Sequence, residues 1–193
     1  TFAKGLRAIL RQDPDVVMVG EMRDVETAQI GIQASLTGHL VLSTVHTNSA
    51  VAAITRLRDM GIESFLLASS LRTVISQRLV RRLCLICKKE ESPSKDSIKL
   101  FNLNTNKKVF ISSGCDACSN TGYQGRIAIA ECIQVDKTLK EMIHNNASEN
   151  LISEHVFKNN QSIDEASSEL ISKGITSCEE LIRINNLQEN ASL

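Results

Sequence analysis

The sequence predicts an α/β fold in which helices flank a parallel sheet. Residues 1–83 alternate between helical and strand patterns, which is typical of such a layer. Two short apolar runs, at residues 16–19 and 40–45, have the length and the β-branched content of strands buried on both faces. A helical pattern separates these runs, so the two strands are expected to lie parallel and to end at the same edge of the sheet.

The elements expected in this region are set by apolar spacing and by residues that end helices. Apolar residues at positions 2, 6, 9 and 10 indicate a first helix, and Pro14 closes it. Asn48 or Ser49 is expected to cap the helix that ends at Met60, just before Gly61. In order, the sequence predicts a helix over 1–12, a strand over 16–19, a helix over 25–36 followed by Gly38, a strand over 40–45, a helix ending at residue 60, and one or two helices over 63–82.

The remaining chain is expected to form two further subdomains. Residues 84–126 break the alternation and hold two CxxC pairs, a polar stretch around Pro93 and the Gly-rich turn TGYQGR. Residues 127–135 read as a strand, and the chain beyond Asp136 is helical, with a last helix at SCEELIRI. We therefore expect three consecutive parts: 1–83 as an α/β core, 84–126 as a four-cysteine metal-binding subdomain, and 127–193 as a mainly helical subdomain.

Composition narrows the classes of function. The 193 residues include 22 basic and 22 acidic side chains, so bulk charge gives no reason to expect a nucleic acid partner. Aromatic residues make up 3% of the chain, which argues against base-stacking platforms. No apolar run approaches the roughly 18 residues of a spanning helix, and no signal peptide opens the chain, so we expect a soluble protein without a membrane span. Because the chain begins at Thr1 in the middle of a helical pattern, we expect a piece of a longer protein.

Glu21 and His46 follow the two predicted strands and should meet at one edge of the sheet. Ligands of parallel sheets gather beyond the carboxyl ends of the strands. A carboxylate at a strand tip can hold Mg²⁺ or its waters, and an imidazole beside it can donate to a terminal phosphate. The alternatives are a polar turn for Glu21 and a capping or core role for His46. His39 precedes its strand, so it is expected to be structural.

The four paired cysteines give the strongest local signal. Cys84 and Cys87 form one pair, Cys115 and Cys118 form the other, and 27 residues lie between the pairs. Four thiolates are the set that structural Zn²⁺ prefers, and such a closed site stabilises a loop without catalysing a reaction. The alternative is four free or disulfide-bonded cysteines, and a zinc ribbon that binds nucleic acid is a further reading of the same motif. Cys132 and Cys178 have no partner at useful spacing and are expected in the core.

Arginines are frequent, and any single one is most simply a surface group. Arg7 and Arg11 lie four apart on the first helix, where like charges repel mildly, so an acidic or anionic partner is expected nearby.

Several stretches together resemble the secretion ATPase superfamily: LRQDPDVVMVGEMRD, TGHLVLSTVHTNSA, the two CxxC pairs and TGYQGR. Within it they resemble the assembly ATPases of type II secretion and type IV pili. Residues 33–72 are most similar to the type II secretion branch. The resemblance covers nearly the whole chain and thins after about residue 136.

This resemblance implies part of a RecA-like P-loop ATPase core that works as a homo-hexamer. It implies ATP hydrolysis that drives pseudopilus assembly and protein export, on the cytoplasmic face of a bacterial inner membrane and with inner-membrane platform proteins as partners. The implied cofactors are ATP, Mg²⁺ and Zn²⁺. The implied roles are Walker B carboxylate for Glu21, histidine box for His46, nucleotide or subunit-interface contacts for Arg7, Arg11, Arg23 and Arg126, and zinc ligands for Cys84, Cys87, Cys115 and Cys118.

The chain departs from the family pattern at one point that matters for activity. It contains no GxxxxGK[ST] loop, which the family places upstream of the region matched here together with an acidic box. Without the backbone N–H groups and the lysine of that loop, most of the phosphate cradle is missing. The sequence therefore predicts that this chain alone is inactive. Two alternatives stay open: a type IV pilus assembly ATPase, and a truncated, non-catalytic, zinc-stabilised remnant.

Overall fold

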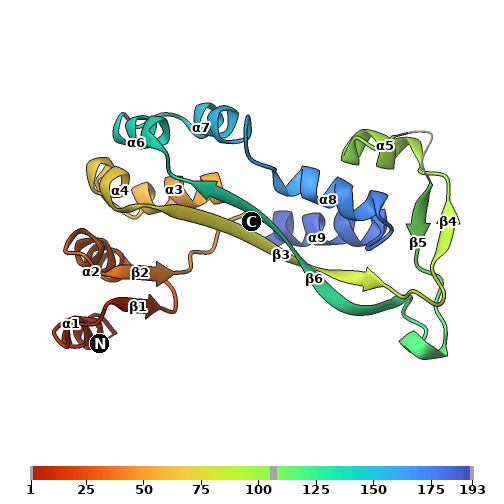
Figure 1. Ribbon diagram of the computed structural model, residues 1–193, viewed down its shortest axis with the longest axis horizontal. Helices are drawn as coiled ribbons and strands as arrows, with labels where there is room; N and C mark the ends of the chain where they lie inside the picture. The colour runs from red at the N-terminus through yellow and green to blue at the C-terminus, as the bar shows by residue number, and fades with distance from the viewer. Residues whose placement is uncertain (1, 105–107, 192–193) are drawn as a thin grey trace. The chain divides into compact units, whose positions relative to one another are not determined.

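The computed structural model describes residues 2–104 and 108–191 (Figure 1). The chain divides into two compact units. Unit 1 consists of Thr1–Ile75 and Cys132–Asn160, and unit 2 consists of Ser76–Glu131 and Gln161–Leu193. Two strands, β3 (Thr73–Leu83) and β6 (Tyr123–Gln134), each begin in one unit and end in the other. The units thus combine distant segments, while the division into three consecutive functional parts stays a proposal.

The first half of unit 1 has the predicted α/β alternation. In chain order it contains α1 (Phe2–Leu10), β1 (Val16–Val19), α2 (Val25–Leu36) and β2 (Leu40–Ser43). The strands pair in parallel, from Val16 opposite Leu40 to Val19 opposite Ser43. Their shared core is a group of buried apolar residues: Ala3, Leu6, Val17, Val19 and Ile30. The expected helix–strand–helix–strand order of this segment is confirmed.

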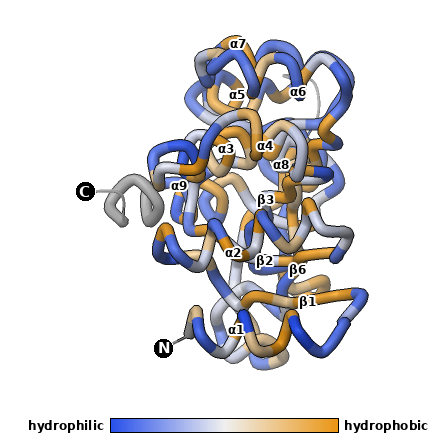
Figure 2. Tube along the Cα trace, turned by 90° about the vertical axis from the view of Figure 1, so that its left-hand side faces the viewer, coloured by the Kyte–Doolittle hydropathy of each residue, from blue (hydrophilic) through white to orange (hydrophobic). Residues whose placement is uncertain are grey.

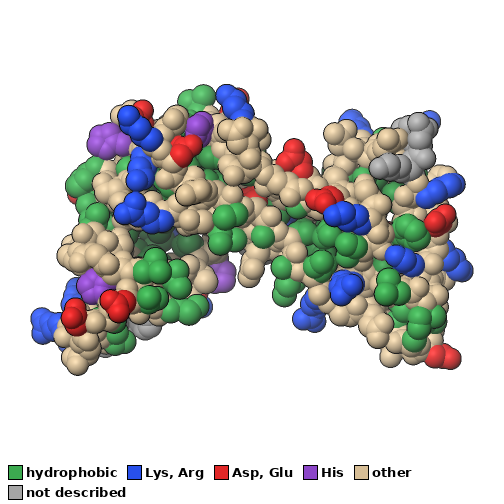
Figure 3. All heavy atoms as spheres, viewed as in Figure 1, with side chains coloured by type: hydrophobic (Ala, Val, Ile, Leu, Met, Phe, Trp, Pro, Cys, Tyr) green, Lys and Arg blue, Asp and Glu red, His purple; other side chains and the backbone are tan. Residues whose placement is uncertain are grey.

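The expectation that both strands are buried on two faces is wrong. Along β1, Val17 and Val19 are buried, but Val16 and Met18 are 55% and 74% exposed. On β2, Leu40 and Leu42 are also exposed. Both strands are coloured as hydrophobic along most of their length in Figure 2, and Figure 3 shows hydrophobic side chains at the surface over them. The reason is that α1 and α2 pack on one face, and within the described part of unit 1 no element covers the other.

The second half of unit 1 is a helical layer with its own core. It contains α3 (Ala50–Asp59), α4 (Ser64–Ser70), α6 (Lys137–His144) and α7 (Glu149–Val156). Fully buried apolar side chains hold these helices together: Ile54, Leu67, Ile133, Leu139, Ile143 and Ile152. Ser49 is the N-cap of α3, because its hydroxyl accepts the Ala52 N–H at 3.0 Å, so one of the two expected caps is confirmed.

The helices expected over residues 63–82 are only partly present. The helix α4 ends at Ser70, Leu71 is extended, and β3 follows. Thr73, Val74 and Ile75 favour a strand because they are β-branched, and exposed and less exposed residues alternate along most of β3. The leucine and arginine residues further along β3 are compatible with the apolar spacing of a helix as well as with that of a strand. This ambiguity explains the incorrect helix prediction.

The strand expected over 127–135 is present as β6, but it starts earlier, at Tyr123 within TGYQGR. It pairs with β3 in a two-stranded sheet. The Val135 N–H donates to the Arg72 carbonyl at one end, and the Cys84 N–H donates to the Gly122 carbonyl at the other. The start of one strand therefore lies beside the end of the other, which is the antiparallel arrangement.

Unit 2 joins a small hairpin, a short helix and two C-terminal helices around a separate core. Strands β4 (Lys89–Glu91) and β5 (Val109–Ile111) pair antiparallel, and α5 (Lys95–Phe101) lies between them in sequence. The short 3-10 helix η1 (Asp116–Cys118) precedes β6, and α8 (Ile163–Ser172) and α9 (Cys178–Ala191) complete the unit. Its core consists of buried apolar residues: Val80, Phe101, Leu103, Val109, Ile129, Ile171, Leu181 and Ile184.

The helical character expected beyond Asp136 is confirmed by α6 to α9. Cys178 is half-buried, whereas Cys132 is exposed, so the core position expected for Cys132 is wrong. Cys132 lies on the exposed side of an alternating strand, between the buried Glu131 and Ile133. Among the described residues, no helix is long and apolar enough to cross a membrane.

Candidate functional sites

The carboxyl edge of the parallel strands brings Glu21 and His46 together. The Met22 N–H donates to the Thr44 carbonyl at 3.0 Å, and the Thr44 hydroxyl donates to the Gly20 carbonyl at 2.7 Å. These bonds extend the pairing of β1 and β2 past the ends of the strands. They hold the segments that carry Glu21 and His46 side by side, as the strand pattern predicted.

The Glu21 carboxylate contacts one cationic and one titratable side chain. Its Oε1 accepts from an Arg23 guanidinium nitrogen at 2.7 Å, and its Oε2 lies 3.1 Å from His46 Nε2. The hydrogen bond from Arg23 is the main reason that the pKa of Glu21 is lowered, although partial burial opposes it. The carboxylate is therefore ionised at neutral pH and can act only as an acceptor.

The contacts of Glu21 form a solvent-accessible cluster and not a buried ion pair. The Glu21 side chain is 32% exposed, Arg23 is 75% exposed and His46 is 86% exposed. Because Mg²⁺ keeps several waters and takes one or two protein carboxylates, an accessible carboxylate at a strand tip fits its ligand preference. The His46 Nε2–H that donates to Glu21 can turn to an incoming anion, since its ring is open to solvent.

The arginines singled out from the sequence are placed differently from one another. Arg7 on α1 forms an ion pair with Glu26 on α2 at 3.0 Å, which supplies the acidic partner expected for this helix face. Arg11 follows α1 in an exposed turn, and Arg23 contacts Glu21 as described. Arg126 belongs to unit 2, where it is exposed beside a pocket.

His39 has the structural position that the sequence predicted. Its Nδ1 lies 3.0 Å from the Ala34 carbonyl and 3.2 Å from the Thr37 hydroxyl, at the end of α2. At the other end of α2, Asp24 accepts the Thr27 N–H at 2.8 Å, an N-cap that the sequence analysis did not assign. The signal for that cap was an acidic residue directly before the first helical position.

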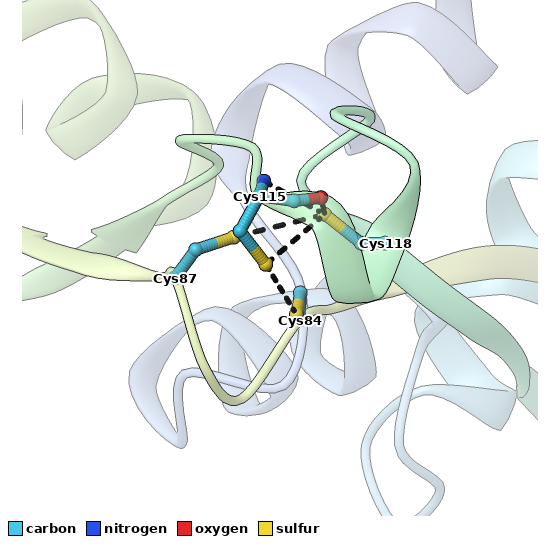
Figure 4. Close-up of side chains that lie close together, drawn as sticks. All are labelled: Cys84, Cys87, Cys115 and Cys118. Atoms are coloured by element: carbon cyan, nitrogen blue, oxygen red, sulfur yellow. Dashed lines mark hydrogen bonds between the residues drawn. The ribbon is translucent and has the colours of Figure 1, made fainter.

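The four cysteines of the CxxC pairs converge in unit 2 (Figure 4). Sulfur atoms lie 3.9 Å apart for Cys84 and Cys115, 3.8 Å for Cys87 and Cys118, and 3.7 Å for Cys115 and Cys118. All four sulfurs lie within 4.8 Å of one another. A disulfide requires about 2.05 Å, so these cysteines are free thiols or metal ligands.

The cluster fits a tetrahedral metal ion. The edge of a regular tetrahedron is about 1.6 times the distance from its centre to a corner. The three sulfur separations of 3.7 to 3.9 Å match such an edge for a centre roughly 2.3 Å from each sulfur, the usual Zn–S bond length, and all the sulfurs lie within 4.8 Å of one another. A metal ion held by all four sulfurs would have no open position for a reacting water, as in a structural site.

The backbone around the cluster also favours a thiolate. Cys118 Sγ accepts the N–H groups of Cys115 and Gly122, both at 3.2 Å. Burial alone would raise the pKa of Cys118, but these two N–H donors, together with contacts to the Cys115 and Cys87 thiols, lower the pKa to about 6. Burial raises the pKa of Cys115 to about 11. Gly122 has φ +76°, and a Cβ there would come 2.5 Å from the Ser112 Cβ, so this turn requires glycine.

A second charged cluster in unit 2 was missed by the sequence analysis. The Glu180 side chain is fully buried and accepts from the guanidinium groups of Arg81 and Arg183. Arg183 lies three residues after Glu180 on α9, a spacing that the sequence could have revealed. Arg81 is 99 residues away on β3, so only the fold brings it to the same carboxylate.

The chain thus combines a parallel strand pair that carries a carboxylate and a histidine at one edge with a cluster of four cysteines. The chain belongs to the type II/IV secretion system protein family, whose family model matches residues 1–183. Type II secretion system ATPase E of Vibrio cholerae serotype O1 is 53% identical over 186 residues, which cover 95% of this chain and 37% of that protein. The putative type II secretion system protein E of Escherichia coli K12 is 51% identical over 186 residues, with 95% and 38% covered.

Solved structures with a similar fold include a pilus retraction motor and an ATPase. The pilus retraction motor PilT with bound ADP matches with a TM-score of 0.65 and 27% identity, over 93% of this chain and 42% of that one. The Legionella pneumophila ATPase DotB matches with a TM-score of 0.65 and 22% identity, over 96% of this chain and 42% of that one, and shows the fold alone. The chain thus spans 37% to 38% of the length of the two curated relatives described above.

Proposed function

We propose that this chain supplies part of the nucleotide site of an ATPase that powers type II secretion. The observation that carries the proposal is the Glu21–His46 pair, held at 3.1 Å at the carboxyl edge of a parallel strand pair. Ligands of open α/β sheets bind at that edge, and phosphoryl transfer depends mainly on positioned charge. Membership of the secretion family and relatives named as type II secretion proteins support the same reading.

Each residue at this edge takes a distinct role in the proposal. Glu21 holds Mg²⁺ or its waters with the carboxylate that Arg23 keeps ionised. When bound, Mg²⁺ neutralises charge on the phosphate oxygens. His46 donates its Nε2–H toward the terminal phosphate. Arg23 stays beside Glu21 and orients it.

The other arginines complete the proposed site or the contact between subunits. Arg7 and Arg11 lie on and just after α1, and Arg7 is oriented by Glu26. Arg126 lies in unit 2 and is proposed for a nucleotide or subunit contact in the assembled enzyme. In these roles guanidinium groups bind phosphate oxygens or carboxylates through paired hydrogen bonds.

The four-thiolate cluster is proposed to hold a structural Zn²⁺ ion. Cys84 follows β3 directly, while Cys115 and Cys118 flank η1 just before β6. The cluster therefore ties together the ends of two long strands. Its role is to stabilise unit 2, and ATP hydrolysis does not use it directly.

The complete site needs a phosphate-binding loop from outside these residues. The 193 residues contain no GxxxxGK[ST] sequence, and the chain spans 37% of its Vibrio cholerae relative. We propose that the working enzyme is a homo-hexamer that contains such a loop, acts on the cytoplasmic face of the inner membrane and engages platform proteins there. Relatives at 47% to 53% identity carry type II secretion names, which supports type II secretion over the alternative of pilus assembly.

A chimera tests whether this chain supplies half of a nucleotide site. In the chimera, the matching segment of the Vibrio cholerae relative is replaced by this chain, and ATP hydrolysis is compared with that of the chain alone. We expect Mg²⁺-dependent turnover from the chimera and none from the chain. A chimera that forms the same oligomer as the relative and binds ATP but hydrolyses none contradicts the proposal. ATP turnover by the chain alone contradicts the proposal that it holds only part of the nucleotide site.

A further inference from the structure

Unit 2 contains a shallow pocket, and Arg126 is the one lining residue to which the proposed function gives a role. Its volume is about 510 Å³, within the range of sites that bind small molecules or peptide side chains. The described residues that line it share a strand or a turn next to the cysteine cluster: Arg81, Thr121, Tyr123, Gly125 and Arg126. Two of these five residues are arginines and none is acidic.

The charges around the pocket do not cancel. Arg81 lines the pocket and shares the buried Glu180 carboxylate with Arg183, at 2.6 Å and 2.8 Å. One carboxylate therefore faces two guanidinium groups, and Arg126 adds a third at the pocket wall. Three positive charges and one negative charge leave an excess of two positive charges at this surface.

The pocket walls are fixed by hydrogen bonds before any ligand arrives. The Arg81 guanidinium lies 4.1 Å from the Tyr123 ring centroid, and the Tyr123 hydroxyl is 2.7 Å from the Ser177 hydroxyl. The Thr121 hydroxyl donates to the Cys118 carbonyl at 2.6 Å and accepts the Tyr123 N–H at 3.3 Å. Because these side chains are already ordered, little side-chain entropy is lost when a ligand binds.

We propose that this pocket binds an acidic peptide segment of a partner protein through the excess arginine charge. Guanidinium groups bind carboxylates through two parallel hydrogen bonds, and Arg126 is exposed and can make them. Apart from Gly125 and its two chain neighbours, no described atom lies within 4 Å of a Cβ position built on Gly125, so a peptide backbone can approach the strand closely there. The residues lining this pocket come from β3, β6 and the turn before β6, and none of them lies at a helix N-terminus, where backbone N–H groups favour phosphate.

Binding of a fluorescent hexaglutamate peptide to the full chain tests the proposal. Affinity is measured by anisotropy at an ionic strength of about 0.01 M and again at about 0.15 M, where the Debye length falls from roughly 30 Å to 8 Å. The variants are Arg126→Gln, Arg126→Lys and, as a matched control, Arg82→Gln. Arg82 is exposed and adjacent to Arg81 on β3, but it does not line the pocket.

We expect Arg126→Gln to weaken peptide binding about tenfold, because one charge-assisted pair is lost. Arg126→Lys keeps the charge without the paired donors, so its peptide affinity should lie between those of the wild type and Arg126→Gln. Arg82→Gln should change the peptide affinity less than about twofold. Absence of peptide binding overturns the proposal, and so does equal weakening by Arg126→Gln and Arg82→Gln.

Competition with ATP and with tripolyphosphate separates this inference from the proposed function. We expect unlabelled hexaglutamate to displace the probe at lower concentration than either phosphate compound. If ATP or tripolyphosphate displaces it more effectively, the pocket is a phosphate site and the peptide proposal is wrong. The chimera experiment does not depend on this result, since it reports turnover and not peptide binding.

Discussion

Replacing Glu180 with glutamine removes the one carboxylate that Arg81 and Arg183 share in unit 2. Glu180 is fully buried, whereas the side chains of its two partners are 39% and 48% exposed. The Arg81 backbone N–H also donates to Glu180, at 3.0 Å. Glutamine keeps the size of the side chain and one acceptor oxygen, so the substitution tests the charge with little change in packing.

The pKa of Glu180 gives the size of the expected effect. Burial alone would raise this pKa, but hydrogen bonds from Arg183 and Arg81 outweigh it and lower the pKa from 4.5 to about 2. At about 1.4 kcal/mol for each pKa unit, the difference corresponds to roughly 3 kcal/mol of folding free energy. We expect Glu180→Gln to lose about 2 to 3 kcal/mol at pH 7, because the exposed arginines can partly turn to water.

The sign of the pH dependence follows from the lowered pKa. A carboxyl whose pKa is lower in the folded chain stabilises it above the unfolded pKa, and this contribution is lost as pH falls toward the folded pKa. The difference in free energy of unfolding between wild type and Glu180→Gln should therefore reach its full value above about pH 5. Near pH 3, this difference should be smaller by roughly 2 kcal/mol.

Urea unfolding of both proteins between pH 7 and pH 3 measures this gap. Glu179→Gln is the matched control, because Glu179 is the exposed neighbour with the same charge. Comparing the two variants also cancels any loss of metal from the cysteines in acid. Equal stability of Glu180→Gln and Glu179→Gln at pH 7 refutes the reasoning, as does a gap that widens on acidification.

Three further predictions concern the cysteine cluster, the strand edge and a helix cap. Purified chain should contain about one zinc, with Zn–S distances near 2.3 Å by X-ray absorption, and Cys115→Ser should lose it; a folded, metal-free wild type contradicts the site. Arg23→Gln should raise the pKa of Glu21, measured by carboxyl carbon NMR, because the main cause of its lowering is removed; an unchanged pKa excludes that cause. Ser49→Ala should cost about 1 kcal/mol in urea unfolding, and a cost no larger than that of the exposed Ser69→Ala would show that the cap is unimportant.

Local signals in the sequence were enough for the order of elements from α1 to α3. Pro14, Gly38 and Gly61 mark ends of elements because their backbone preferences are local. The burial of the strands was not predictable in the same way. An apolar run such as residues 16–19 shows that a strand can be buried on two faces, but which faces are covered depends on elements that pack from elsewhere.

The same distinction holds for the sites. The proximity of Glu21 and His46 could be predicted because each follows a strand pattern, and that of the four cysteines because of the CxxC spacing. The Arg81–Glu180 pair joins β3 to α9 across 99 residues, and no local pattern marks it. The pocket beside this pair could not be predicted for the same reason, because the residues around Tyr123 and those of β3 come together only in the folded chain.

The most direct test of the central claim is ATP turnover by the chimera with Glu21→Gln. Glu63→Gln is the matched control, because Glu63 is exposed and its side chain makes no capping hydrogen bond at the start of α4. Oligomer size and ATP binding are measured on the same samples. Removing one group that stabilises charge in a transition state usually costs 10² to 10³ in rate. The account predicts a loss of at least about a hundredfold for Glu21→Gln with the oligomer intact, and turnover equal to that of Glu63→Gln would contradict it.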